Sequence, residues 1–279
     1  MPNIVYLNKK YILFKDAKIP IEDRGFQFSD SVYEVVKIIN KKLLDFDFHI
    51  RRLKYSTSEL NFNFKVNSQL LKKIFQNLII KNKLSNGIIY LQVTRGVQSR
   101  EHAYKKNLKP NLIIYTTKKK FNLPNKSYKG FKAITYPDIR WGRPDIKTTS
   151  LLANIIASTE AKKNGAYEAI LVKTKKITEA SHSNIWIVKG KKIITHPANK
   201  EILKGVTRTV LINIIHSLDL KLIEKEFSLN ELYKSDEVFV TSSGSLVTPI
   251  IQIDNIKINK KKIGKITKTL ALSFYKSII

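Results

Sequence analysis

Short apolar runs of strand length alternate along this chain with longer segments whose apolar residues recur at helical spacing. Strands are predicted at 4–8, 11–14, 32–39, 42–46, 88–94 and 111–117, and helices at about 47–60 and 68–83. A period of two suits a half-buried strand, whereas spacings of three and four suit an amphipathic helix. The first third of the chain is therefore expected to fold as a mixed α/β (α+β) domain.

The same mixture resumes after a polar and basic interruption. Residues 118–129 lose the apolar period and include Pro124, and a length of 279 residues fits two domains of ordinary size. We therefore predict an N-terminal α/β domain at 1–119, a linker at 120–128 and a C-terminal α/β domain at 129–279.

The second half is expected to contain six strands and three helices. Strands are predicted at 131–136, 167–173, 184–188, 192–195, 221–225 and 237–241, and helices at 148–164, 207–218 and 263–277. In the first of these helices, the residues predicted to face the core are Leu151, Leu152, Ile155, Ile156 and Thr159. Gly165 is expected to end that helix.

The chain is strongly basic, with 51 Lys and Arg against 22 Asp and Glu and a formal charge of +29. Such a charge favours the binding of polyanions, because a cationic surface that binds phosphates releases the counterions condensed on them. The excess is mostly lysine in scattered pairs and triplets, without a basic helix, an aromatic-basic stripe or a zinc module. A composition-wide bias explains this better than a nucleic-acid interface, so we expect no nucleic-acid partner. The positive field would still attract anionic small molecules.

Several chemistries are excluded by what the sequence lacks. It has no cysteine, which rules out thiolate catalysis, thiolate metal ligation and disulfides. The five histidines lack metal-ligand spacing, and neither a glycine-rich nucleotide loop nor a Gly-x-Ser-x-Gly elbow is present. No apolar run approaches the roughly 20 residues that span a bilayer, and the N-terminus lacks the charge order of a signal peptide. We therefore expect a cytoplasmic protein with no membrane partner and no catalytic metal.

Several unusual local clusters remain, each weak on its own. They are Glu22-Asp23-Arg24-Gly25, Val32-Tyr33-Glu34, Asp145-Ile146-Lys147, Thr178-Glu179-Ala180-Ser181, Gly205-Val206-Thr207-Arg208 and Thr241-Ser242-Ser243-Gly244-Ser245. Longer stretches accompany them, such as Leu91-Gln92-Val93-Thr94-Arg95-Gly96-Val97 and Thr195-His196-Pro197-Ala198-Asn199. In this order and at these separations, the chain from Tyr11 to about Ile253 closely resembles the fold-type IV pyridoxal-phosphate enzymes. Within that family, it is most similar to the D-amino-acid aminotransferases.

The resemblance implies pyridoxal 5′-phosphate as the cofactor, bound between the two domains. Lys147 matches the family's Schiff-base lysine, whose amine holds the cofactor and later moves a proton between substrate and cofactor. Glu179 matches the carboxylate that keeps the ring nitrogen protonated, so that the ring can accept electron density. Without the resemblance, Glu179 could be an ordinary turn carboxylate before a strand, and Lys147 one lysine among many.

The cofactor phosphate needs backbone N–H groups and hydroxyls, ideally at a helix N-terminus. Gly205-Val206-Thr207 opens a predicted helix, and an arginine would add a bidentate cation. The resemblance assigns the remaining cofactor contacts to Arg52, Leu203, Val206, Thr207, Ser242 and Ser243, with Leu203 packed against the ring. Thr207 would also be a good N-cap in any protein, so the ordinary interpretation stays open for that residue.

A third group of residues is implied to hold the substrate. Arg100-x-His102, with Tyr33 opposite, resembles the α-carboxylate trap of the D-specific enzymes, in which this loop reaches in from the partner subunit. Holding that carboxylate decides which face of the substrate Cα presents its hydrogen to Lys147. The resemblance therefore implies an obligate homodimer. Without it, the tripeptide could be only an exposed loop.

The sequence departs from the family pattern at two places. Ser29-Asp30-Ser31 stands where Gly-Asp-Gly is usual, and Ala180-Ser181-His182 stands where a Gly/Ser-rich run follows the ring-facing glutamate. The bulkier side chains would narrow the pocket or change hydrogen bonds near the ring. They bear on the substrate range rather than on the use of the cofactor.

Together these expectations describe a D-amino-acid aminotransferase. The expected reaction is ping-pong transfer of the amino group of D-alanine to 2-oxoglutarate, giving pyruvate and D-glutamate for peptidoglycan precursors. Two alternatives of the same fold remain open, a branched-chain L-amino-acid aminotransferase and an aminodeoxychorismate lyase, which share Lys147 and Glu179 but hold the carboxylate differently. A basic nucleic-acid-binding protein is the alternative from another class.

Overall fold

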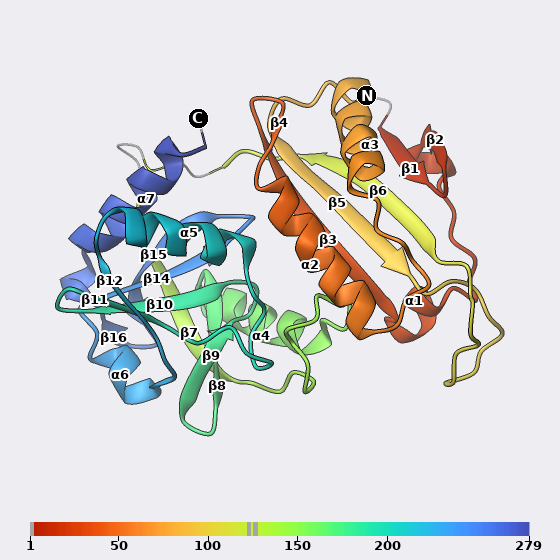
Figure 1. Cartoon of the computed structure of the whole chain (residues 1–279). Helices are drawn as coiled ribbons and strands as arrows, with labels where there is room; N and C mark the ends of the chain where they lie inside the picture. Colours follow the sequence, from red (N-terminus) through yellow and green to blue (C-terminus); the bar gives the residue numbers. More distant parts are fainter. Residues whose placement is uncertain (1–2, 122–123, 125–127, 279) are drawn as a thin grey trace. The chain divides into compact units, whose positions relative to one another are not determined.

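The chain folds into two compact units. The computed structural model describes residues 3–121, 124 and 128–278 (Figure 1). The first unit comprises Met1–Lys120 together with Ile146–Ser150, and the second comprises Phe121–Asp145 together with Leu151–Ile279. The short segment that contains Lys147 therefore belongs to the first unit, although it lies far along the sequence. Within the predicted linker at 120–128, residues 122–123 and 125–127 lie outside the described residues.

The first unit is built on a six-stranded antiparallel sheet. Its strands are β1 (Ile4–Leu7), β2 (Lys10–Leu13), β3 (Ser31–Ile39), β4 (Lys42–Leu43), β5 (Gly87–Thr94) and β6 (Asn111–Lys118), in the spatial order β2-β1-β6-β5-β3-β4. The helices are η1 (Phe14–Asp16), α1 (Arg24–Phe28), α2 (Phe46–Glu59) and α3 (Ser68–Lys81). Figure 1 shows α2 and α3 lying across the sheet, so the core of this unit forms between these two helices and the strands.

The junction between β4 and α2 differs from the sequence prediction. Phe46, the first residue of α2, packs edge-on against Phe75 of α3, with ring centroids 5.7 Å apart. Burying a ring of this size contributes about 1.5–3 kcal/mol. The predicted strand at 42–46 is therefore wrong after Leu43, because Phe46 is drawn into the helical core. Asp45 makes the turn in a left-handed conformation with φ of +55°.

The second unit is built on a ten-stranded mixed sheet. Its strands are β7 (Phe131–Pro137), β8 (Glu168–Lys173), β9 (Lys176–Ala180), β10 (Asn184–Lys189), β11 (Lys192–Thr195), β12 (Lys221–Glu224), β13 (Phe227–Ser228), β14 (Glu237–Ser242), β15 (Leu246–Ile253) and β16 (Ile256–Lys257). The spatial order is β12-β11-β10-β14-β15-β7-β8-β9-β13, with β16 beside β15. The helices are α4 (Leu152–Lys163), α5 (Val206–Ser217), α6 (Leu229–Tyr233), η2 (Asn259–Lys261) and α7 (Lys265–Lys276).

Helices α5 and α7 pack together over the central strands of this sheet (Figure 1). Beneath them, Trp186 stacks on Phe239 at 5.6 Å and donates its indole N–H to Thr241 Oγ1 at 2.9 Å. Two of the longer strands here were not predicted from the sequence, β9 and β15. The first has a single large aliphatic residue, and the second contains Pro249, which argues against a strand.

The prediction of which face of α4 is buried is wrong. Three large residues of the predicted face are exposed, Leu152 by 72%, Ile155 by 58% and Ile156 by 41%. Ala157 and Ala161 pack on the sheet instead, in a cluster with Ala169 and Leu171 of β8. Small side chains let the helix lie close to the strands, so the buried face is the one with small residues rather than large ones. Thr159 is exposed as well.

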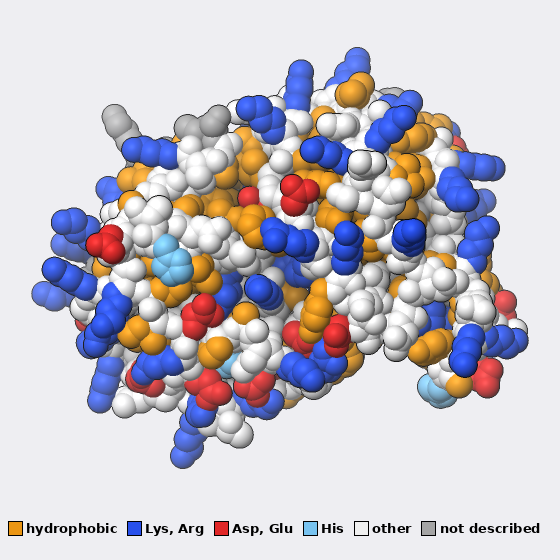
Figure 2. Space-filling view, in the orientation of Figure 1, with side chains coloured by type: hydrophobic (Ala, Val, Ile, Leu, Met, Phe, Trp, Pro, Cys, Tyr) orange, Lys and Arg blue, Asp and Glu red, His pale blue; other side chains and the backbone are white. Residues whose placement is uncertain are grey.

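The surface charge is dispersed. Figure 2 shows Lys and Arg side chains scattered over the visible face, among apolar and neutral side chains, rather than gathered into one stripe. This distribution agrees with a composition-wide lysine bias. Among the described residues, no helix combines the length and the apolar character needed to cross a membrane.

Candidate active site

The backbone of Lys147 is fixed by the first residues of β3. The Tyr33 amide donates to the Lys147 carbonyl at 3.0 Å, and Thr148 bridges to the same strand. The Lys147 amide donates to Ser56 Oγ of α2 at 3.2 Å. A strand and a helix of the first unit therefore hold the segment that carries this lysine.

The side chain of Lys147 lies over an aromatic ring. Its Nζ is 4.0 Å from the centroid of Tyr33, and Tyr33 stacks on Tyr90 at 5.6 Å. Burial raises the pKa of the Tyr90 phenol and of Tyr115 beyond it. These neighbouring phenols therefore stay neutral, and the amine meets the face of a ring, a contact worth about 0.5–1 kcal/mol at exposed sites.

Arg52 of α2 is bound by a carboxylate that the sequence analysis did not single out for a role. Its Nε and Nη2 donate to the two oxygens of Glu34, at 2.7 and 2.8 Å, and His49 Nδ1 lies 2.7 Å from the same carboxylate. Burial alone would raise the pKa of Glu34, but the guanidinium and the ring lower it to about 2. A bidentate carboxylate fixes the plane of a guanidinium, so Glu34 orients Arg52.

We expect Glu34→Gln to lower the free energy of unfolding by about 3–5 kcal/mol at neutral pH, because Arg52, whose side chain is 9% exposed, loses its bidentate carboxylate. The carboxylate has a pKa of about 2 when folded against 4.5 when exposed, so its contribution is full well above pH 4.5 and is lost as the pH falls toward 2. Urea unfolding of both proteins across this range should show their difference shrinking. A difference that stays constant would contradict the ion pair.

Arg100 and His102 lie on an exposed loop between β5 and β6, which Figure 1 shows projecting from the sheet. Arg24 anchors this loop by donating to the carbonyl of His102 at 2.9 Å and to the preceding carbonyl at 2.7 Å. Phe28 contacts both predicted residues, with His102 at 5.5 Å between rings and the Arg100 guanidinium at 5.3 Å. The structure thus brings Arg100 and His102 together, but among the described residues neither has a hydrogen bond or ring contact with Tyr33.

The first departure from the family pattern is accommodated locally. Ser29 ends α1 in a left-handed conformation, with φ of +55°, where glycine would meet less steric resistance. Ser31 Oγ forms a hydrogen bond with Thr149 Oγ1. Since Thr149 is two residues from Lys147, the Ser31 hydroxyl ties the lysine segment to β3, which a glycine could not do.

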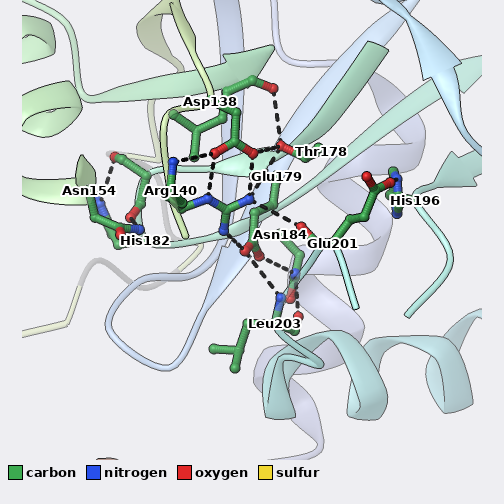
Figure 3. A network of polar contacts seen from close by, with 12 residues as sticks. Asp138, Arg140, Asn154, Thr178, Glu179, His182, Asn184, His196, Glu201 and Leu203 are labelled. Atoms are coloured by element: carbon green, nitrogen blue, oxygen red, sulfur yellow. Dashed lines mark hydrogen bonds and ion pairs between the residues drawn. The ribbon is translucent and has the colours of Figure 1, made fainter. Parts of the chain in front are cut away.

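In the second unit, Glu179 of β9 is buried and surrounded by donors (Figure 3). Asn184 Nδ2 donates to one carboxylate oxygen at 3.0 Å, and the Leu203 amide and Arg140 approach the other, the amide at 3.1 Å. Burial raises the pKa of Glu179 to about 7, although Arg140 and the Leu203 amide favour the charged form. Two predicted site residues, Glu179 and Leu203, are therefore in direct contact.

Arg140 was not singled out by the sequence analysis. Its Nε and Nη2 donate to Asp138 at 2.9 and 2.7 Å, and Thr178 Oγ1 donates to the same carboxylate at 2.7 Å (Figure 3). Burial alone would lower the pKa of Arg140, but Asp138 and Glu179 raise it. Arg140 thus stays charged and holds Glu179. The pair Asp138-x-Arg140 directly after a predicted strand is the signal that could have drawn attention to it.

Helix α5 begins without a side-chain cap. Its N-cap is Gly205, so Thr207 lies inside the first turn and the ordinary N-cap interpretation of Thr207 is wrong. Val206 and Thr207 are buried. Since the first-turn amides of a helix lack intrahelical partners and carry a partial positive charge, they form a site for an anion such as a phosphate.

The serine turn between β14 and β15 offers further hydroxyls. Ser242 Oγ forms a hydrogen bond with Ser245 Oγ at 2.8 Å, and Ser243 is half-buried beside it. Among the residues that the structure describes, no hydrogen bond joins this turn to the first turn of α5.

Position 205 has no space for a side chain, so only glycine fits there. A Cβ atom at this position would lie 2.1 Å from Asn184 Oδ1, and the Asn184 amide links Glu179 to the Leu203 carbonyl. We expect Gly205→Ala to cost about 1–3 kcal/mol of stability and to weaken cofactor binding about tenfold or more. Gly142→Ala is the matched control, because nothing lies within 4 Å of its Cβ position. Equal cofactor affinity of the two variants, measured by fluorescence titration, would contradict this role of Gly205.

The second departure from the family pattern, at His182, places an imidazole ring beside the buried carboxylate of Glu168. His182 Nδ1 lies 3.1 Å from Glu168 Oε1, and Ser183 Oγ donates to the other oxygen at 2.9 Å. Burial raises the pKa of Glu168. The histidine thus changes hydrogen bonding around β8 and β9, while Glu179 keeps its own partners.

The described residues match the chemistry of pyridoxal phosphate, group by group. In the first unit, Lys147 offers an amine for an aldehyde and Arg52 an oriented cation for a phosphate. In the second, Glu179 offers a buried carboxylate for a protonated ring nitrogen, and α5 offers free amides for the phosphate. The donor set therefore fits this cofactor.

Comparisons with known proteins agree with that chemistry. The Amino-transferase class IV family profile matches residues 31–253. The chain is 35% identical over 277 residues to the D-alanine aminotransferase of Listeria innocua, covering 99% of this chain and 96% of that protein. It is 35% identical over 276 residues to the D-alanine aminotransferase of Staphylococcus aureus strain MSSA476, covering 98% and 97%.

A solved structure shares the whole fold. The branched-chain amino acid aminotransferase from Escherichia coli superposes with a TM-score of 0.89 at 22% identity, covering 99% of this chain and 94% of that one. At this identity the likeness concerns the fold alone. The full-length sequence relatives and the family match together show that this chain belongs to the class IV aminotransferases, the transaminases of fold type IV.

Proposed function

We propose that this transaminase uses pyridoxal 5′-phosphate to transfer the amino group of D-alanine to 2-oxoglutarate by a ping-pong mechanism. Its products would feed peptidoglycan precursors in the cytoplasm. The observation that carries the cofactor assignment is the position of Lys147, whose amine lies over the Tyr33 ring and whose backbone pairs with β3. Near-full-length similarity to D-alanine aminotransferases supports the choice of substrate.

Bound cofactor would supply an aldehyde carbon that links to amines and a ring that accepts electron density. Lys147 would hold that aldehyde and, once displaced by substrate, would move a proton from the substrate Cα to the cofactor carbon C4′. The Glu179 carboxylate would accept a hydrogen bond from the protonated ring nitrogen of the cofactor. Arg140, charged through its contacts with Asp138, would keep the Glu179 carboxylate in place.

The phosphate would be held by groups that are already positioned within their own units. The amides of Val206 and Thr207 and the Thr207 hydroxyl would donate from α5, and Ser242 and Ser243 from their turn. Arg52 would add a charge-assisted contact, worth about 1.5–3 kcal/mol, in the plane that Glu34 sets. The Leu203 side chain would pack against the ring.

We also propose a homodimer, in which Arg100 and His102 of one subunit bind the substrate carboxylate in the other, opposite Tyr33. Two features of the chain support this. The loop that carries Arg100 and His102 is exposed and is anchored by Arg24. The large apolar residues of α4 are exposed, and such a patch is typical of a surface that a second protein covers.

Arg100→Ala and His102→Ala should each lower kcat/KM for D-alanine by about 10- to 150-fold. This range corresponds to the loss of one charge-assisted hydrogen bond, worth about 1.5–3 kcal/mol. Arg51→Ala is the matched control, because Arg51 is an exposed arginine that lies 4.4 Å over a phenylalanine ring, much as Arg100 does. The cofactor absorption should be unchanged in all three variants. Full turnover of D-alanine by the Arg100 and His102 variants would remove the stereochemical assignment and leave the cofactor assignment standing.

Subunit complementation tests whether the loop acts in the partner. A chain with Lys147→Arg and a chain with Arg100→Ala are co-expressed with different tags, and the mixed dimer is isolated. If the loop reaches across, one site of the mixed dimer has both Lys147 and Arg100, and about half of the native activity should return. If the loop serves its own chain, neither site is intact and the mixed dimer shows no more than the residual activity of Arg100→Ala.

The nearest rival is a branched-chain L-amino-acid aminotransferase. The solved structures named as such are 20–24% identical to this chain and support only the shared fold. A panel of D- and L-amino acids as donors to 2-oxoglutarate separates the two, with keto-acid product as the readout. Turnover of L-leucine without D-alanine would favour the rival.

A further inference from the structure

A cluster of metal-ligand side chains lies apart from the proposed cofactor contacts. His196 follows β11, Glu201 lies in the loop before α5, and Glu226 lies between β12 and β13. One ligand atom from each lies within 4.8 Å of the others. Figure 3 shows the His196 ring and the Glu201 carboxylate facing each other. All three residues belong to the second unit.

The His196 ring is buried, with 2% exposure, and its tautomer is determined by its surroundings. Nδ1 lies 2.9 Å from the Pro197 carbonyl, which can only accept, so Nδ1 carries the proton and donates it. In the neutral ring, Nε2 then presents a lone pair. It lies 3.7 Å from Glu201 Oε2, too far for a hydrogen bond. Metal-binding histidines are held in this way, with the other ring nitrogen donating to a carbonyl or carboxylate.

Two arginines hold the backbone of the cluster by donating to main-chain carbonyls. Arg208 donates to the His196 carbonyl at 2.9 Å, and Arg140 donates to the Glu201 carbonyl at 3.2 Å. Neither contact uses the side-chain atoms that could bind a metal. Two of the three ligand positions are therefore held independently of any ion.

His196 Nε2 faces a carboxylate oxygen of Glu201, with no cationic side chain of the described residues between them. Lys173 approaches Glu201 at 3.0 Å and Lys176 pairs with Glu226, but both lysine side chains are more than half exposed, at 53% and 58%. They offset the carboxylate charges without contacting the ring. A buried lone pair and a carboxylate oxygen that face each other repel unless a proton or a metal ion lies between them.

We propose that His196, Glu201 and Glu226 bind a divalent transition-metal ion, with Zn²⁺ as the best match. One imidazole nitrogen and two carboxylate oxygens, completed by water, form a ligand set that zinc accepts in tetrahedral geometry. Ligand atoms about 2.0–2.2 Å from zinc lie about 3.4 Å apart. The 4.8 Å spread of the cluster therefore closes when the exposed Glu226 side chain moves inward.

Such an ion would act on the loop that leads into α5. Glu201 lies two residues before Leu203, whose amide donates to Glu179 at 3.1 Å. The ion would not touch Glu179, so it would restrain the position of the loop without contacting that carboxylate. Its binding is independent of the proposed substrate.

The test uses untagged protein loaded with pyridoxal phosphate, treated with a chelator and dialysed free of both. Titration with ZnCl₂ in a calorimeter should give one ion per chain, and the ion should raise Tm. Loss of an outer hydrogen-bond partner costs about 10- to 100-fold in metal affinity, so Glu201→Gln and Glu226→Gln should each raise Kd at least about 100-fold. In unliganded form both variants should keep the Tm of the parent within a few degrees.

Two variants serve as matched controls. Asp236→Asn removes another exposed carboxylate that pairs with a lysine, Lys189 at 3.1 Å, and His216→Gln removes an exposed helical histidine. Both should bind Zn²⁺ like the parent. Absorption of bound Co²⁺ should show the intense visible bands of tetrahedral coordination in the parent and in both controls, and lose them in Glu201→Gln.

His196→Gln tests the nitrogen ligand, and the two glutamate variants decide the matter if that variant does not fold. Absence of stoichiometric binding would overturn the site. Binding that is unchanged in Glu201→Gln and Glu226→Gln, or equally weakened in the controls, would show adventitious surface binding only and would also overturn it. Activity assays are not needed for either outcome, so failure of the metal site is distinguishable from failure of the proposed function.

Discussion

Lys147→Arg should abolish transamination, with kcat/KM for the preferred donor falling at least about 10⁴-fold. Proton transfer by a positioned side chain alone contributes about 10²- to 10⁴-fold, and the variant also loses the covalent link to the cofactor. Arginine keeps the positive charge and can still lie over Tyr33, so the fold should be retained. Steady-state rates with D-alanine and single-turnover measurements check the loss.

Two controls separate chemistry from structure in this experiment. Lys162→Arg, in the last turn of α4, should be fully active. Adding a small free amine such as methylamine to Lys147→Arg should restore part of the rate, because the amine can take the missing proton-transfer role. A Lys147→Arg protein that turns over D-alanine at the parent rate would refute the assignment of this residue.

Glu179→Gln should lower kcat by about 10²- to 10³-fold, the size of the loss when one charge-stabilising group is removed from an active site. A neutral amide cannot balance a protonated ring nitrogen, so the ring withdraws electrons less well. The carboxylate is also the partner of Arg140, so stability is measured alongside kcat. The cofactor absorption band should shift in the variant, which a purely structural defect would not cause.

The matched control is Glu160→Gln, which neutralises a partly exposed carboxylate on α4 that pairs with Lys163. It should leave both kcat and the absorption band unchanged. Cofactor affinity of Glu179→Gln should fall far less than kcat, because the phosphate contacts remain. Parent-like kcat and an unshifted band in Glu179→Gln would contradict the role of this carboxylate.

The sequence predicted best those elements whose pattern is local and long. The predicted strand at 32–39 and helix at 68–83 match β3 (Ser31–Ile39) and α3 (Ser68–Lys81) closely. The buried face of α4 could not be predicted, because which face packs depends on how closely β7 and β8 approach, and the sheet accepts alanines there. Strand β15 was hidden by Pro249, which the strand accommodates between β14 and β7.

The residues of the candidate site also differ in how far the sequence could predict them. Lys147 and Glu179 could be assigned only through resemblance, because an isolated lysine or glutamate carries no local signal of its role. The residues that orient the site were missed for a further reason. Glu34 and Arg52 are 18 residues apart, and Arg140 and Glu179 are 39 apart. Such pairings come from strand and helix placement, which spacing along one sequence does not reveal.

Borohydride reduction of the pyridoxal-phosphate-loaded protein, followed by proteolysis and mass spectrometry, tests the central claim most directly. We expect a single phosphopyridoxyl group, attached to the peptide that contains residue 147. A stable adduct on a different lysine, or no adduct on a protein that nevertheless transaminates, would contradict the account.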